Sequence, residues 1–150
     1  MKHFIYYILA VVFTLLTGCL RDKHETAVYP QKIFETVNTK YPSDKNTLIF
    51  IGAPEGFIAP RLATSAVEKD VDNGKVVAII SALALKTSTI VIAGENESLT
   101  ATTLAKALTT GKDKINGAKA IVIGAKDTQK NLADIAATSG VALEFIDNPI

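Results

Sequence analysis

Three short turns that combine glycine with acidic residues are the segments of this sequence best suited to chemistry. They have the sequences IGAPEG at 51–56, IAGENE at 92–97 and IGAKDT at 123–128. Glycines let a ligand approach the backbone closely, and carboxylates can act as acid/base groups or bind a divalent cation. The candidate ligand-binding residues are therefore Gly52, Glu55, Gly56, Gly94, Glu95, Gly124 and Asp127.

Each turn follows or ends a short apolar run, and a fourth run comes later in the chain. The runs are TLIFIG at 47–52, TIVIAG at 89–94, KAIVIGA at 119–125 and VALEFI at 141–146. Continuous apolar runs of this length are typical of strands buried on both faces of a parallel sheet. Since parallel strands end at the same edge of the sheet, we expect the turns to lie together. Ligands of α/β sheets generally bind at that edge, in a crevice where the strand order reverses.

The same turns also have an explanation that requires no ligand. Strand-to-helix turns need small residues, and acidic or amide side chains there cap helices and complement their dipoles. None of the turns matches a dinucleotide-binding or phosphate-loop pattern. Capping is the simpler role for the acids, and Pro54 with Gly56 makes the first turn the place where a ligand would be sought first.

The segments between the apolar runs predict helices. Residues 98–111 and 127–140 carry apolar side chains toward one side, with Ser98 and either Asp127 or Thr128 as expected N-caps. Residues 59–71 show the same pattern, whereas 75–86 fit a helix or a strand, and their length favours a helix. The predicted fold is a small three-layer α/β domain with a mainly parallel sheet of about four strands and right-handed crossovers.

A further helix is predicted within PQKIFETVNTKYP at 30–42, with Pro30 in its first turn. Ile33, Phe34, Val37 and Tyr41 fall on one face of it. This apolar face either docks on a partner protein or packs on the domain's own core, and we expect the core.

The amino-terminal 19 residues, MKHFIYYILAVVFTLLTGC, have the architecture of a signal peptide. Lys2 precedes an apolar stretch from Phe4 to Leu16, which at about 13 residues is too short to cross a hydrocarbon core of about 30 Å as a helix. The segment Leu16-Thr17-Gly18-Cys19 resembles the lipobox of bacterial lipoproteins.

This resemblance, which covers only the first 19 residues, implies a lipid anchor on Cys19. In that family the cysteine thiol receives diacylglycerol, the peptide before it is removed, and the new amino terminus is acylated, commonly with palmitate. Several acyl chains anchor a protein stably, whereas one does so only marginally. Because Leu20 and not Asp follows the cysteine, the resemblance further implies the outer membrane of a Gram-negative cell, on its periplasmic side.

The expected organisation is a cleaved signal peptide at 1–18, a polar tether at 19–29 and one α/β domain at 30–150. Loss of Lys2 with the signal peptide leaves 15 basic against 15 acidic residues. This neutral balance, with only two arginines in the chain, gives no indication of nucleic-acid binding.

Few residues in the expected mature chain could catalyse a reaction. His24, in the expected tether, is its one histidine, and Cys19 is its one thiol. We therefore expect no catalytic centre, metal site or cofactor. Two roles remain open: a non-catalytic envelope protein that binds another protein in a secretion, conjugation, pilus or cell-wall complex, or a small-ligand-binding module or minor hydrolase that uses the strand ends.

Overall fold

The computed structural model describes residues 23–43, 45–53, 59–69 and 74–147. The chain divides into two units, Met1–Gln31 and Lys32–Ile150. Within the first unit the structure describes only the start of helix α2, and the second unit is an α/β domain. The predictions for the signal peptide, the lipobox with Cys19, and Glu55 and Gly56 lie outside the described residues.

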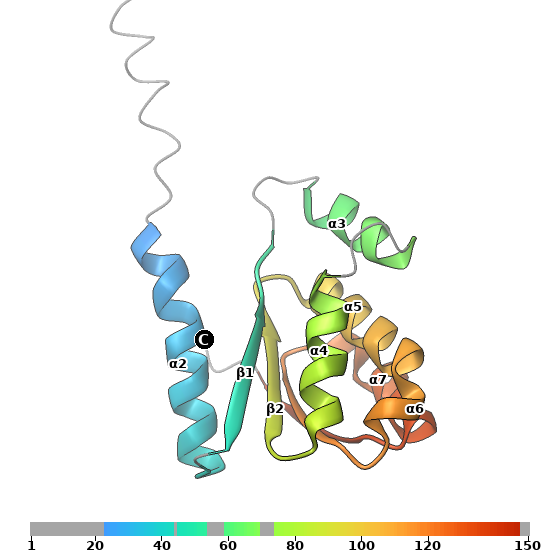
Figure 1. The fold of residues 1–150 in the computed structure, drawn as a ribbon. Coiled ribbons are helices and arrows are strands. Elements are labelled where there is room, and N and C mark those ends of the chain that lie inside the picture. The colour runs from blue at the N-terminus through green and yellow to red at the C-terminus, as the bar shows by residue number, and fades with distance from the viewer. Residues whose placement is uncertain (1–22, 44, 54–58, 70–73, 148–150) are drawn as a thin grey trace, which may run out of the picture. The chain divides into compact units, whose positions relative to one another are not determined.

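The second unit is built on a four-stranded parallel sheet, as expected (Figure 1). Its strands are β1 (Asn46–Ile51), β2 (Thr89–Gly94), β3 (Lys119–Ile123) and β4 (Ala142–Ile146). They lie in the order β1-β2-β3-β4, and each pairs in parallel with its neighbour, as in the register Val91↔Ile121. The four apolar runs of the sequence thus form the strands.

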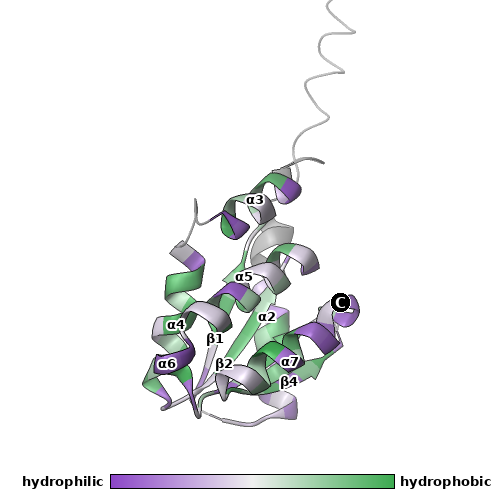
Figure 2. Ribbon diagram, turned by 90° about the vertical axis from the view of Figure 1, so that its right-hand side faces the viewer, coloured by the Kyte–Doolittle hydropathy of each residue, from purple (hydrophilic) through white to green (hydrophobic). Residues whose placement is uncertain are grey.

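Helices connect consecutive strands. They are α3 (Ala59–Glu68) and α4 (Gly74–Leu85) after β1, α5 (Glu97–Thr110) and α6 (Lys112–Ile115) after β2, and the 3-10 turn η1 (Lys126–Thr128) with α7 (Gln129–Ser139) after β3. The helix predicted over 75–86 is confirmed. Figures 1 and 2 show these helices on one face of the sheet.

The sequential strand order explains this arrangement. When every crossover moves the chain in the same direction along the sheet and has the same hand, every connecting helix falls on the same face. Among the four strands the order never reverses, so the sheet has no switch point of the kind that opens a ligand crevice in doubly wound folds.

The helix-side core is formed by alternate residues of the strands. Ile90 and Ile92 of β2 and Val122 of β3 pack there with Leu104 and Leu108 of α5, and all five are buried. Side chains alternate between the faces of a strand, so the residues between them face the other way.

The opposite face of the sheet is buried as well. Val91 of β2 and Ile121 of β3 are buried but do not belong to the helix-side core. Helix α2 (Lys23–Lys40) supplies Ile33 and Val37, both fully buried, from the half of the helix that belongs to the second unit. The expectation that this apolar face packs on the domain's own core is confirmed for Ile33 and Val37, which are therefore not available to dock on a partner, whereas Phe34 and Tyr41 are only partly buried.

Two details of α2 differ from the expectation. The helix begins at Lys23, so Pro30 lies inside it and not in its first turn. The residues before Pro30 include Lys, Glu and Ala, which have good helix propensity and let the helix extend through them. At the other end, the Asn46 side-chain amide donates to Asn38 Oδ1 and to the Tyr41 carbonyl, both at 2.9 Å, and ties the helix end to β1.

Candidate functional site

Those predicted site residues that the structure describes lie at the carboxyl edge of the sheet, where all four strands end. Gly52 follows β1, Gly94 ends β2, and Gly124 follows β3. Parallel pairing of the strands brings these positions to a common edge, as the sequence predicts. What each residue does there is decided by its contacts.

Glu95 joins two of the turns to each other. Its Oε2 accepts a hydrogen bond from the Ala53 backbone N–H at 2.9 Å, and its own backbone N–H donates to the Ile51 carbonyl at 3.1 Å. The carboxylate therefore satisfies a backbone donor in the turn after β1. This contact gives the acid a structural role that needs no ligand, but it links two turns and does not cap a helix as the sequence predicts.

The start of α5 is capped by a residue other than the expected one. Asn96 is the N-cap, and its Oδ1 accepts from the Leu99 backbone N–H at 2.9 Å. Ser98 lies two residues after the N-cap, inside the helix, so the prediction that it caps α5 is wrong. Asn is as good an N-cap as Ser, and an earlier start lets Glu97 occupy the first turn, where a negative charge suits the helix dipole.

Two of the glycines are required by the packing of the chain itself. A Cβ atom at Gly94 would lie 2.1 Å from Thr100 Oγ1 and 2.7 Å from the Ile51 carbonyl oxygen. Gly124 has a φ of +80°, which disfavours other residues, and a Cβ there would lie 2.9 Å from Glu97 Oε1. Gly52 has open space around it, with nothing within 4 Å of a built Cβ.

The acids that the structure describes do not cluster into a metal site. Asp127 is exposed in η1, and Asp147 is exposed after β4. No group of three or more potential His, Cys, Asp or Glu ligands occurs in the part of the chain that the structure describes.

A cavity of about 480 Å³ lies at the carboxyl edge beside α3. Its lining residues are Ile51, Gly52, Ala53, Ala63, Val67, Lys75, Leu99 and Thr103. Of the predicted site residues that are described, only Gly52 belongs to it. Lys75, its one described charged residue, directs Nζ to the Phe50 carbonyl oxygen at 3.3 Å. The described lining is thus mostly apolar and includes neither of the predicted acids that the structure describes, Glu95 and Asp127.

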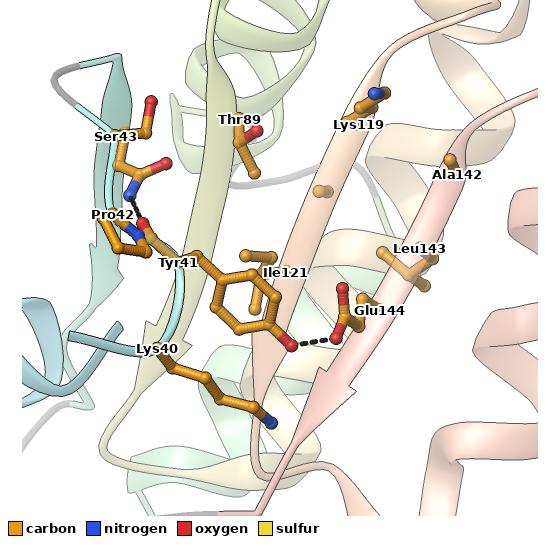
Figure 3. A pocket seen from close by; sticks show the side chains of 12 residues that line it. Lys40, Tyr41, Pro42, Ser43, Thr89, Lys119, Ile121, Ala142, Leu143 and Glu144 are labelled. Atoms are coloured by element: carbon orange, nitrogen blue, oxygen red, sulfur yellow. Dashed lines mark hydrogen bonds between the residues drawn. The ribbon is translucent and has the colours of Figure 1, made fainter. Parts of the chain in front are cut away.

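Two further cavities lie at the opposite, amino edge of the sheet, where the strands begin. The larger, which we name the tyrosine cavity, has a volume of about 740 Å³. Its lining residues are Lys40, Tyr41, Pro42, Ser43, Asn46, Thr89, Lys119, Ala120, Ile121, Ala142, Leu143 and Glu144. Figure 3 shows Lys119 and Lys40 toward opposite ends of it, with the Tyr41 ring between them and its hydroxyl donating to Glu144 Oε1.

The smaller, which we name the lysine cavity, has a volume of about 250 Å³. Its lining residues are Ser43, Lys45, Lys86, Thr87, Ser88, Thr89, Gly117 and Lys119. Three of them, Ser43, Thr89 and Lys119, also line the tyrosine cavity, so the two cavities adjoin. The described lining of the lysine cavity contains three cations, four hydroxyl groups and no acid.

The sequence contains a signal for the amino-edge cavities in lysines that belong to no motif. Lys45 directly precedes β1, Lys86 precedes β2 by three residues, and Lys119 opens β3. The starts of parallel strands meet at one edge just as their ends do, so lysines placed before three strands converge. The neutral overall charge concealed this grouping.

Comparison of the chain with known protein families, with curated proteins and with solved structures finds no match. Over the described residues, no helix combines the length and the apolar character needed to cross a membrane.

Proposed function

We propose that this protein is a lipid-anchored, non-catalytic protein of the bacterial cell envelope that faces the periplasm from the outer membrane and binds another envelope protein. The observation that carries the proposal is the segment Leu16-Thr17-Gly18-Cys19 after a short apolar stretch. Lipid on Cys19 accounts for the one thiol of the chain.

The described carboxyl edge supports a non-catalytic role. Glu95 is bonded to a backbone N–H, and Gly94 and Gly124 are fixed by packing and backbone conformation. These residues hold the turns together, so their presence in the sequence needs no reaction to explain it.

The outer face of α4 supports a protein partner. Val76, Ile79 and Leu83 are buried against the domain, yet Val77 and Leu85 on the outward side are 57% and 68% exposed. Figure 2 shows α4 largely in the hydrophobic colour. A helix that is apolar around most of its circumference is ordinarily buried on all sides, and an apolar partner surface would bury the outer side of this one.

The anchor is tested by labelling cells with a palmitate analogue. The wild-type chain incorporates the label and sediments with membranes, and Cys19→Ser does neither. A Cys19→Ser chain that still carries the label would overturn the anchor.

The partner surface is tested by a photo-crosslinking residue placed at Ser81, which is exposed on α4. We expect one discrete adduct with an envelope protein of the secretion, conjugation, pilus or cell-wall machinery, and its loss when Leu85 is also changed to Glu. The same crosslinker at Asn131, exposed on α7, is the matched control. Equal adducts from both positions, or none from Ser81, would contradict the α4 surface.

A small-ligand-binding role is a second candidate, and the cavities favour it. At the carboxyl edge the space around Gly52 opens into a cavity of about 480 Å³. Saturable protection of Gly52 from amide exchange by a small molecule would support that role.

A further inference from the structure

The cations of the lysine cavity are not used by any contact described above. Lys45, Lys86 and Lys119 are exposed, and no hydrogen bond or ion pair joins their ammonium groups to another described residue. Asp44, between Ser43 and Lys45 in the chain, lies outside the described residues. Three like charges that line one cavity of about 250 Å³ repel one another, and an anion among them removes that repulsion.

The backbone of Lys86 provides a second, independent observation. Its φ is 55°, in the left-handed region, directly after the last residue of α4. This position after a helix is usually glycine, because other residues are strained there. Strained backbone held at a cavity is typical of functional positions, and here it places a lysine where a glycine would be more stable.

The hydroxyl groups specify the kind of anion. Ser43, Thr87, Ser88 and Thr89 line the same cavity as the lysines. A phosphate monoester carries close to two negative charges and three strong acceptor oxygens, which matches several ammonium groups and several hydroxyl donors better than a carboxylate does.

The adjoining tyrosine cavity specifies the rest of the ligand. Its apolar residues include Ile121, Ala142 and Leu143, and the Tyr41 ring lies within it (Figure 3). The Glu144 carboxylate accepts the Tyr41 hydroxyl proton in a hydrogen bond, which holds the ring in place. An apolar or ring-shaped group attached to a phosphate at Lys119 would extend into this space.

We propose that the amino edge of the sheet binds a phosphate monoester, with its phosphate group among Lys45, Lys86 and Lys119 and an apolar or ring-bearing part in the tyrosine cavity. This site depends neither on the lipid at Cys19 nor on the α4 surface. The phosphate-binding proposal can therefore be wrong while the proposed function is right, and the proposed function can be wrong while the phosphate-binding proposal is right.

The test uses the full chain in a neutral detergent, with amide chemical shifts as the readout and inorganic phosphate and phenyl phosphate as probes. Both probes shift the amides of Thr87, Ser88 and Gly117 in a saturable manner. Phenyl phosphate also shifts Ile121 and binds more tightly, because its ring fills the tyrosine cavity. Sodium chloride at matched ionic strength produces neither effect.

Lys86→Gly separates binding from folding. Loss of one ammonium group near an exposed phosphate weakens phenyl phosphate binding about five-fold. The melting temperature stays equal or rises, since glycine relieves the left-handed backbone. Lys130→Gln, an exposed lysine on α7, is the matched charge control and leaves affinity unchanged.

Three results would overturn the proposal. They are chemical shifts that do not saturate, a phenyl phosphate affinity that Lys86→Gly and Lys119→Gln leave unchanged, and an equal loss of that affinity in Lys130→Gln.

A short-chain phosphatidic acid in the same detergent identifies the source of the phosphate. Tighter binding than that of phenyl phosphate assigns the site to lipid headgroups, and weaker binding assigns it to soluble esters.

Discussion

Gly52 and Gly94 occupy similar places at the ends of neighbouring strands, yet their surroundings differ. Gly94 is enclosed by Thr100 and Ile51, whereas Gly52 has open space around it. Glycine at position 94 is a packing requirement, whereas glycine at position 52 leaves the backbone accessible. Residue type alone could not distinguish these two roles.

Gly94→Ala should lower the free energy of unfolding by roughly 1–3 kcal/mol, because the added methyl group meets backbone as well as side-chain atoms. Gly52→Ala should change it by less than about 0.5 kcal/mol. Urea unfolding of both variants measures the difference. Equal losses of stability in the two variants would contradict the close packing around Gly94.

At the level of the elements, the half of α2 in the second unit is part of the fold. Ile33 and Val37 are fully buried, while Thr36 between them is exposed. A helix that covers the second face of a parallel sheet stabilises it, because such sheets are normally buried on both sides.

Ile33→Ala should therefore cost about 2–5 kcal/mol of stability, through lost burial and the cavity left behind. Thr36→Ala, the matched exposed change, should stay within about 0.5 kcal/mol. Thermal or urea unfolding followed by circular dichroism checks both. If Ile33→Ala lowers the free energy of unfolding no more than Thr36→Ala does, α2 is not part of the core.

The elements were largely predictable, and the site was not. Apolar runs and helical periodicity are local signals, so the four strands and the helix at Gly74–Leu85 could be found from the sequence. Asn96 as the N-cap and the order of the strands depend on three-dimensional packing. The lysine cavity depends on that order too, because Lys86 and Lys119 meet only when β2 and β3 are neighbours.

At the scale of the whole domain, burial is concentrated on the two central strands. Both faces of the central strands are buried, as shown by Val91 and Ile92 of β2 and by Ile121 and Val122 of β3. In β4, by contrast, Ala142 and Glu144 are exposed. Local opening of the sheet should therefore begin at its outer strands.

Amide exchange should follow this difference. The hydrogen-bonded amides of β2 and β3 should exchange only through global unfolding, and those of β4 should exchange faster by local opening. Native-state hydrogen exchange in increasing denaturant measures the two opening free energies. A β4 protected as strongly as β2 would contradict the expected order of opening.

The sequential strand order has a consequence for how the chain acquires its structure. Each strand pairs with the one that precedes it, so the sheet can grow in the order in which the chain emerges during synthesis. The hydrogen bond from Tyr41 to Glu144 joins residues 103 positions apart and cannot form until β4 is in place. The tyrosine cavity is therefore completed last, and a chain truncated before β4 could form most of its sheet without it.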